Sequence, residues 1–279
     1  MMQTVRQLLR TAAGQLNSSD SPQLDAEVLL ANVLGTDRSR LYAHPEMTPS
    51  RTSAADFKRL LNSRRAGCPV AYLTGSREFR SMVLRVTRHT LIPRPETELL
   101  VEAALERIPG HGRAGILDLG TGSGAIGVAV AAARPYCTVT AVDLSTDALA
   151  VARENAAANG VANISFRQSD WFGNLHNRRF DAILCNPPYV EFPRSALPPG
   201  EIRFEPRLAL DGGHNGTDCI RIIIFGALRH INQGGFMIIE HAHDQGDYVR
   251  QQFRINHYRD ISTRRDYAGL ERYTCALRP

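Results

Sequence analysis

The chain has 279 residues, of which 43% are hydrophobic and 22% charged, and its formal net charge is +5. This composition is ordinary for a soluble globular protein, and no stretch approaches the roughly 20 consecutive apolar residues of a membrane helix. The positive charge is scattered along the chain. Basic runs such as Arg64-Arg65 are too short to predict a nucleic-acid-binding stripe. The length favours one large domain with a smaller appendage.

The amino terminus and the cysteines indicate a protein of the cytoplasm. Residues 1–10 mix charged and apolar side chains and lack the apolar core of a signal peptide. The cysteines are odd in number and none belongs to a Cys-x-x-Cys motif, which argues against a disulfide framework and a zinc site. We therefore expect reduced thiols, no metal and no membrane attachment. The five cysteines are Cys68, Cys137, Cys185, Cys219 and Cys275.

Residues 1–78 are predicted to form a small helical domain. Apolar side chains between Val5 and Leu16 recur at the spacing of one helix face. A second helix is predicted to have Ser21 as its N-cap, a proline at its first position and Gly35 as its end. A third helix is expected over 53–65. No chemistry is visible in these residues.

Residues 97–279 repeat the order strand, turn, helix, which is typical of a parallel sheet with helices on both faces. Before them, alternating apolar residues within 79–96 predict a hairpin or linker. The expected fold is thus α/β, with a Rossmann-like sheet preceded by the small helical domain. Strands are expected at 116–119, 137–142, 164–167, 180–185, 236–240 and 273–277, and helices at 125–133 and 145–159.

The turn after the first strand of this sheet is rich in glycine. Glycines let the backbone approach a ligand closely, and Asp143, at the end of the second strand, can accept hydrogen bonds from ribose hydroxyls. The spacing between the turn and this acid is that of sites for nucleoside-containing cofactors. The alternative is a turn that only packs a helix tightly on a strand. The turn consists of Gly120, Thr121, Gly122, Ser123 and Gly124.

Two further residues narrow the cofactor to S-adenosylmethionine. Asp118, just before the glycines, would repel a pyrophosphate but attract the positively charged methionine portion of this cofactor. Trp171, the single tryptophan, follows the third strand, where the adenine is expected. Each residue also has a structural alternative: Asp118 can tie loop amides together, and Trp171 can belong to the core.

The run Asn186-Pro187-Pro188-Tyr189 follows the fourth strand and predicts the reacting site. A planar NH₂ group is a poor nucleophile because its lone pair is conjugated. The Asn186 side-chain oxygen and the Pro187 carbonyl can accept its two hydrogens and aim the nitrogen at the methyl group, while Tyr189 stacks on the planar substrate. Positioning of this kind supplies up to roughly 7–11 kcal/mol, so neither a metal nor a general base is required. Alternatively, the two prolines only end the strand and begin a loop.

These motifs resemble the release factor glutamine methyltransferases, the PrmC or HemK family. The resemblance implies transfer of a methyl group from S-adenosylmethionine to the glutamine of the Gly-Gly-Gln motif in peptide-chain release factors, which modulates translation termination. The product would be S-adenosylhomocysteine. The resemblance extends to Pro69-Val70-Ala71-Tyr72-Leu73-Thr74-Gly75, Ile92-Pro93-Arg94-Pro95-Glu96-Thr97-Glu98, Glu205-Pro206 and Leu210-Asp211-Gly212-Gly213.

The resemblance also implies roles for particular residues. The helical domain would bind the release factor, and Pro93 to Glu96 would wall the cofactor pocket, unless Arg94 and Glu96 pair with each other. The implied cofactor-binding residues are Gly120, Thr121, Gly122, Ser123, Gly124, Asp143, Trp171 and Asn186. The implied catalytic residues are Asn186, Pro187 and Tyr189, and Asn186, Pro187, Pro188 and Tyr189 would bind the glutamine.

One departure from the family is His241-Ala242-His243, where a glycine is expected near Ala242. Two histidines without an acidic or thiol ligand pattern are more typical of surface or packing residues than of a metal site.

The leading alternative is a methyltransferase for an exocyclic amino group of RNA or DNA, because adenine's amine poses the same chemical problem. Without an extra domain or a concentrated basic and aromatic surface, we expect no stable nucleic-acid complex. A non-catalytic protein that retains the cofactor is disfavoured by the intact Asn186, Pro187 and Tyr189. A nicotinamide oxidoreductase is disfavoured because nothing after the fourth strand offers hydride chemistry.

Overall fold

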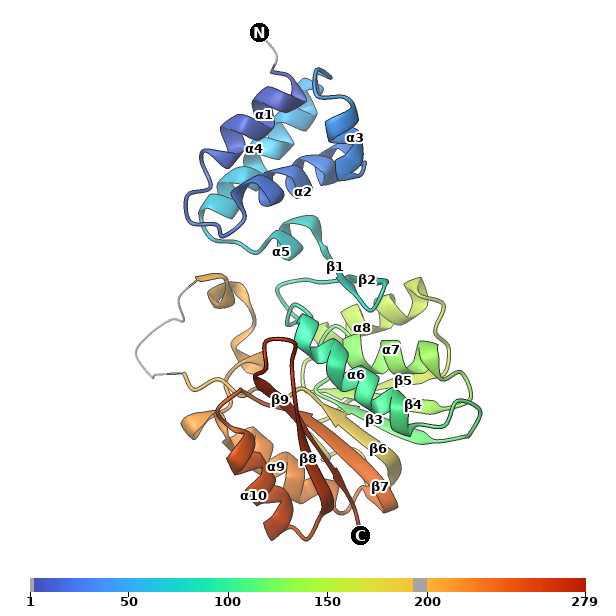
Figure 1. The fold of residues 1–279 in the computed structure, drawn as a ribbon. Coiled ribbons are helices and arrows are strands. Elements are labelled where there is room, and N and C mark those ends of the chain that lie inside the picture. Colours follow the sequence, from blue (N-terminus) through green and yellow to red (C-terminus); the bar gives the residue numbers. More distant parts are fainter. Residues whose placement is uncertain (1–2, 193–199) are drawn as a thin grey trace. The chain divides into compact units, whose positions relative to one another are not determined.

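The computed structural model describes residues 3–192 and 200–279 and divides into two compact units. The first unit is helical and consists of Met1–Ser76 and Pro199–Phe204. The second unit is α/β and consists of Arg77–Pro198 and Glu205–Pro279 (Figure 1). The sequence patterns therefore missed that a short segment from the second half of the chain belongs with the amino-terminal helices.

The helical unit has a core built from the apolar faces of its helices. Val5 and Leu9 contribute from the first helix, as their spacing predicted, and Leu30 and Phe57 contribute from later ones. Gly35 ends the second helix in the left-handed conformation, as expected for a C-terminal glycine. The helices are α1 (Val5–Ala13), α2 (Pro22–Leu34), α3 (Arg38–Ala43), α4 (Arg51–Arg65), α5 (Val70–Thr74) and the 3-10 helix η1 (Gly200–Phe204).

A buried ion pair ties α2 to α4. The Arg64 Nε donates to Asp25 Oδ2 over 2.6 Å, and both side chains are less than a tenth exposed. Arg64 also pairs with Glu201, so this guanidinium holds η1 as well. Ser21 occupies the N-cap position of α2, but its hydroxyl donates to Asp25 Oδ1 instead of capping the helix.

Arg64→Ala is expected to lower the free energy of unfolding of the helical unit by about 3–5 kcal/mol, because it leaves the buried Asp25 carboxylate without its cation. Urea unfolding of the full chain, followed by circular dichroism, measures this loss. Arg59→Ala is the matched control on the same helix, since its partner Asp56 is exposed and such pairs contribute below about 1 kcal/mol. Equal losses in the two variants would contradict the expectation.

The second unit contains a hairpin and a sheet with seven strands within the described residues. The hairpin strands are β1 (Ser76–Phe79) and β2 (Met82–Arg85). The sheet strands are β3 (Gly115–Leu119), β4 (Thr138–Asp143), β5 (Ile164–Gln168), β6 (Phe180–Cys185), β7 (Ile231–Glu240), β8 (Arg259–Arg265) and β9 (Glu271–Leu277). The helices are α6 (Pro95–Arg107), α7 (Ala125–Ala133), α8 (Thr146–Ala158), α9 (Asp218–Ala227) and α10 (Gly246–Ile255), and η2 (Arg207–Ala209) and η3 (His214–Gly216) are 3-10 turns.

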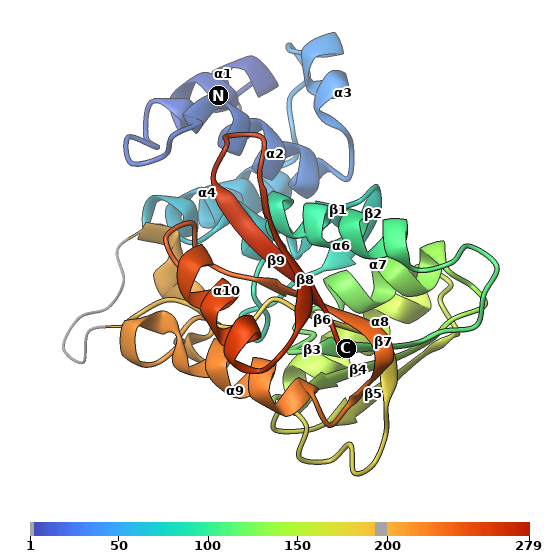
Figure 2. The ribbon, with the colours of Figure 1, turned by 60° about the horizontal axis from the view of Figure 1, so that its bottom comes forward.

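Helices cover both faces of the sheet, as the sequence predicts. Successive strand residues point to opposite faces, so Ile116 joins a core with α6 and α7, and Leu117 joins a core with α9 and α10. Figures 1 and 2 show α6, α7 and α8 on one face and α9 and α10 on the other. Ser145 caps α8 by accepting a hydrogen bond from the Ala148 amide, which confirms the predicted start of that helix.

The strand order β5-β4-β3-β6-β7-β9-β8 places a topological switch between β3 and β6. Strands β3 to β7 pair in parallel, and β9 is antiparallel to both of its neighbours. At such a switch the connections leave in opposite directions, which opens a crevice at the carboxyl ends of the strands. The edge strand β8 was not predicted, because its sequence is mostly polar and half-exposed.

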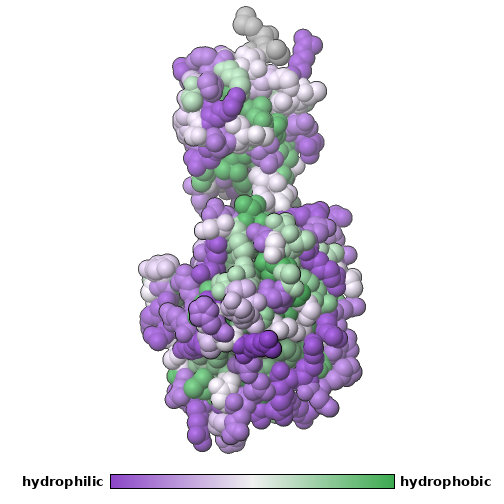
Figure 3. All heavy atoms as spheres, turned by 90° about the vertical axis from the view of Figure 1, so that its right-hand side faces the viewer, coloured by the Kyte–Doolittle hydropathy of each residue, from purple (hydrophilic) through white to green (hydrophobic). Residues whose placement is uncertain are grey.

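Within residues 3–192 and 200–279, none of the helices could span a membrane. On the face drawn in Figure 3, hydrophilic side chains cover much of the surface of each unit. Smaller hydrophobic patches interrupt this hydrophilic surface within each unit. Several large apolar side chains are exposed on the second unit, among them Phe225 and Tyr267.

Candidate active site

A cavity of about 320 Å³ lies at the carboxyl ends of β3 to β6, beside the topological switch. Its volume is at the lower end of the range for sites that enclose small molecules and cofactors, roughly 300–1,000 Å³. Because the loops after four neighbouring strands converge here, residues far apart in sequence share one wall. The predicted site residues that line it are Gly120, Gly122, Asp143, Trp171, Asn186 and Pro188.

The glycine-rich turn presents its backbone to this cavity. Gly120 and Gly122 have φ values of 70° and 56°, which favour glycine. The Gly122 amide donates to Asp143 Oδ2 over 2.8 Å, so the turn is tied to the end of β4. Thr121 and Ser123 are buried and do not line the cavity, nor does Gly124, the N-cap of α7.

Asp118 stabilises the turn from the inside. Its Oδ2 accepts hydrogen bonds from Thr121 Oγ1, over 2.6 Å, and from the Gly127 amide, over 2.9 Å, so the structural role considered above is present. Its Oδ1 is buried and has no hydrogen-bond partner among the described residues. Burial, with a smaller contribution from the nearby Asp143 charge, raises the pKa of Asp118 to about 6. Asp118 is fully buried and does not line the cavity, so its observed contacts are those that hold the turn.

Asp143 has both carboxylate oxygens on backbone amides. Oδ2 accepts from Gly122, and Oδ1 accepts from the Ser145 amide over 2.9 Å. Burial raises the pKa of Asp143 in spite of these bonds. Each oxygen keeps a second lone pair, so a side chain held in this way can still accept hydrogen bonds from a ligand in the cavity.

Trp171 belongs both to the core and to the cavity wall. Its side chain packs against the apolar cluster between the sheet and α9, and its ring lies beside Gly120. The residue has a φ of 44°, and its carbonyl accepts a hydrogen bond from Ser169 Oγ over 2.8 Å. The two alternatives considered for this tryptophan are therefore compatible.

The Asn-Pro-Pro-Tyr run leaves β6 at the cavity with two of its side chains bonded to the protein. The Asn186 Nδ2 donates to Thr97 Oγ1 over 3.1 Å, and the Tyr189 hydroxyl donates to Glu240 Oε1 over 3.1 Å. Burial and the Glu240 charge raise the pKa of Tyr189 well above its usual value. Pro187 is buried, and neither it nor Tyr189 lines the cavity.

The segment before α6 differs from expectation. Arg94 does not pair with Glu96 but donates to Glu205 Oε1, and the Ile92 amide donates to Glu205 Oε2 over 3.0 Å. The cavity is lined by the residues just before this segment, and Pro93 to Glu96 do not line it. The lining residues that were not predicted include Arg88, His89, Thr90, Leu91, Leu144, Ser145, Pro206, Leu208, Ala209 and Asp211.

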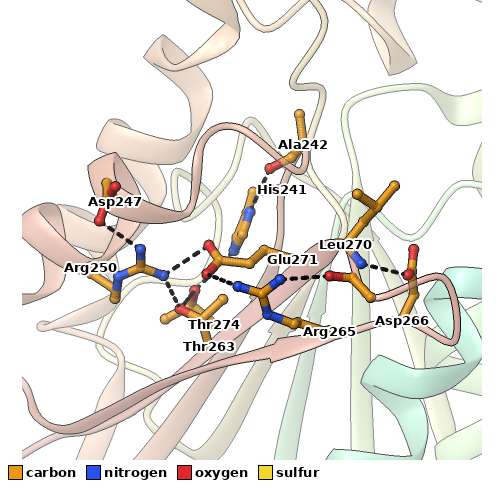
Figure 4. Close-up of polar contacts among 11 residues, drawn as sticks. His241, Ala242, Asp247, Arg250, Thr263, Arg265, Asp266, Leu270, Glu271 and Thr274 are labelled. Atoms are coloured by element: carbon orange, nitrogen blue, oxygen red, sulfur yellow. Dashed lines mark hydrogen bonds and ion pairs between the residues drawn. The ribbon is translucent and has the colours of Figure 1, made fainter.

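The two histidines after β7 lie in different environments. His241 is fully buried, with Nδ1 on the Ala242 carbonyl and Nε2 on Thr274 Oγ1, whereas His243 is exposed. Figure 4 shows His241 in a polar network that continues through Thr274 to Arg250. No group of three or more His, Cys, Asp or Glu residues within 3–192 and 200–279 is placed to hold a metal ion.

Comparison with known proteins agrees with this architecture. Residues 95–196 match the model of the methyltransferase small domain, and residues 7–75 match the PrmC N-terminal domain. A methyltransferase structure from Pyrococcus furiosus superposes with a TM-score of 0.54 at 17% identity, covering 80% of this chain and 98% of that one. The matched model is that of a methyltransferase domain, and the solved structure shares the fold of this chain.

Full-length relatives narrow the class further. The release factor glutamine methyltransferase of Salmonella typhimurium is 46% identical over 267 residues, which cover 96% of each chain. That of Escherichia coli K12 is 44% identical over 266 residues, 95% of this chain and 96% of the relative. This chain belongs to the release factor glutamine methyltransferase family.

The raised pKa of Asp118 makes stability depend on pH. A carboxyl group whose pKa is higher in the folded protein contributes stability below its unfolded pKa and loses this contribution as pH rises through the folded value. The stability difference between wild type and Asp118→Asn should therefore fall by about 2 kcal/mol between pH 4 and pH 8. Urea unfolding at a series of pH values measures it. Asp56→Asn, at an exposed site, is the control, and a constant difference for Asp118→Asn would contradict the prediction.

Proposed function

We propose that this protein transfers a methyl group from S-adenosylmethionine to the side-chain amide nitrogen of the Gly-Gly-Gln glutamine in peptide-chain release factors. It would do so in the cytoplasm and thereby modulate translation termination. The observation that carries this proposal is the Asn186 side chain at the cavity wall, whose amide nitrogen is bonded to Thr97. Its carbonyl oxygen is left to accept a hydrogen from another planar NH₂ group. The near full-length identity to enzymes named for this substrate supports the choice of acceptor.

The residues around the cavity fit the proposed cofactor. Asp118 is fully buried and does not line the cavity, so its charge would favour the positively charged methionine portion from behind the glycine-rich turn. Asp143 would accept hydrogen bonds from the ribose, and Trp171 would contact the adenine together with the apolar Leu144. The cofactor supplies an electrophilic methyl group on a sulfonium sulfur, and S-adenosylhomocysteine remains after transfer.

The Asn-Pro-Pro-Tyr run would position the acceptor amide. Asn186 Oδ1 and the Pro187 carbonyl would accept the two N–H groups and expose the nitrogen lone pair. Tyr189, held at its hydroxyl, would stack on the amide plane. Held in this way, the nitrogen would bond to the methyl carbon as the carbon–sulfur bond breaks with its electron pair left on sulfur, and one N–H proton would then pass to water. Stabilising the positive charge that develops on nitrogen favours this step.

We also propose that the helical unit binds the release factor. Its match to the PrmC N-terminal domain supports this role, because a relative named for this substrate aligns with 96% of this chain. Exposed Tyr42 on α3 and Leu24 on α2 are apolar surface that a protein partner can cover.

The decisive experiment offers three acceptors in parallel: purified release factor, ribosomal RNA and DNA, each with methyl-labelled S-adenosylmethionine. We expect label in the release factor alone, and mass spectrometry should locate the methyl group on the glutamine of the Gly-Gly-Gln motif. Label in a nucleic acid would refute the proposed acceptor and support the alternative, an exocyclic amine.

Asn186→Ala is expected to lower kcat on the release factor by about 10²–10³-fold. The substitution removes the side-chain oxygen that would accept an N–H of the glutamine amide and stabilise the positive charge that develops on its nitrogen. The Kd for S-adenosylmethionine, measured by calorimetry, should change little. Asn177→Ala, at an exposed position of the same unit, serves as the control. A turnover close to wild type would rule out the assigned role.

Asp143→Ala is expected to raise the Kd for S-adenosylmethionine by about tenfold or more, which corresponds to the loss of about one charge-assisted hydrogen bond. Isothermal titration calorimetry measures the affinity. Asp147→Ala, exposed on α8, is the matched control and should bind like wild type. An unchanged affinity in Asp143→Ala would refute the ribose assignment.

A further inference from the structure

A buried carboxylate behind the reacting site connects to two members of the Asn-Pro-Pro-Tyr run. Glu240 is the last residue of β7 and is 2% exposed. Its Oε2 accepts the hydroxyl of Thr97 over 2.7 Å, and its Oε1 accepts the hydroxyl of Tyr189 over 3.1 Å. Both oxygens of this carboxylate are therefore used by groups that belong to the site or contact it.

The hydrogen bonds from Glu240 onward have a fixed direction. The Thr97 hydroxyl has one hydrogen, and this hydrogen goes to Glu240, so Thr97 can only accept from Asn186. This selects the nitrogen side of the Asn186 amide to face Thr97. The carbonyl oxygen of Asn186 must then point the other way. With its amide reversed, Asn186 would present a donor to the incoming NH₂ group and repel it.

We propose that Glu240 is a positioning residue that, through Thr97 and Tyr189, sets the direction of the Asn186 amide and the orientation of the Tyr189 ring. The inference rests on the proposed function, because it assumes that Asn186 Oδ1 accepts a hydrogen from the acceptor amide. Neither Glu240 nor Thr97 lines the cavity, so each acts through a neighbour.

The ionised form of Glu240 is the one that sets this direction. A carboxylate only accepts hydrogen bonds, whereas a protonated carboxyl group can donate to Thr97 and allow the chain of bonds to reverse. Burial raises the pKa of Glu240 to about 7. Among the charged or titratable groups around it, Glu96 on α6 raises this pKa further, and Arg272 on β9 and the Tyr189 hydroxyl lower it. The buried Cys185 thiol on β6 also lies near Glu240, whose charge helps to raise the pKa of that thiol. Turnover should therefore fall as pH drops below neutrality and Glu240 takes up a proton.

Variants of Thr97 test the relay without changing any charge. Thr97→Val removes the hydroxyl and should lower kcat by about 10–100-fold, while the calorimetric Kd for S-adenosylmethionine stays within about twofold. Thr97→Ser keeps the hydroxyl and should restore kcat to within about threefold of wild type. A Thr97→Val enzyme with wild-type kcat, or a Thr97→Ser enzyme as poor as Thr97→Val, would overturn the proposal.

A pH profile tests Glu240 itself. In wild type, kcat should fall by about tenfold per pH unit at most below the pKa of Glu240. Glu240→Gln cannot ionise and cannot accept both hydroxyls through its oxygen alone, so its kcat should be low and lack this acid limb. A Glu240→Gln enzyme that keeps the acid limb of wild type would overturn the proposal. If this variant does not fold, the Thr97 pair still decides.

Infrared spectroscopy supplies a readout that does not depend on turnover. The spectrum of wild type should show a protonated carboxyl band that disappears as pH rises through about 7 and is absent from Glu240→Gln. A band unaffected by the substitution would show that Glu240 does not titrate there. The proposed function fails separately, when wild type labels another acceptor, and the Thr97 variants are then measured with that acceptor.

Discussion

The site is held together by buried carboxylates, of which Asp118 and Glu240 lie at the ends of parallel strands and Glu205 lies between η1 and η2. A carboxylate removed from water is costly unless its oxygens accept hydrogen bonds, so each buried acid fixes the groups that satisfy it. Asp118 fixes the glycine-rich turn, Glu205 fixes the segment before α6, and Glu240 fixes the hydroxyls behind the Asn-Pro-Pro-Tyr run. The walls of the cavity are therefore preorganised by acceptors placed behind them.

Under the proposed function, this arrangement serves an acceptor nitrogen that is unreactive and must be held in place. The catalytic demand is geometric, and geometry is maintained when each side chain has a single hydrogen-bonding choice. The hydrogen bond to Thr97 orients the Asn186 amide. Hydrogen bonds from two backbone amides orient the Asp143 carboxylate. The apolar clusters on both sides of the sheet then keep the strand ends in place.

The sequence predicted those parts of the molecule that depend on local pattern. The glycine-rich turn, Asp143 and Asn186 could be placed at one cavity because each follows a recognisable apolar strand. The partners of these residues could not be predicted, because Glu240 lies 143 residues from Thr97 and no periodicity links them. The same holds for Arg94, whose partner Glu205 is 111 residues away. The edge strand β8 was missed because an edge strand has only one neighbouring strand. Few of its side chains are buried, so its sequence contains little of the apolar pattern from which a strand is predicted.

The short segment Pro199–Phe204 ties the two units together through the chain itself. The 3-10 helix η1 (Gly200–Phe204) belongs to the helical unit, and the next residue, Glu205, belongs to the α/β unit, where it contacts Arg94 and Ile92. A swap of the amino-terminal helices for those of another protein therefore needs three junctions, after residues 76, 198 and 204. An exchange of the first 76 residues alone would leave η1 behind in the α/β half of the chain.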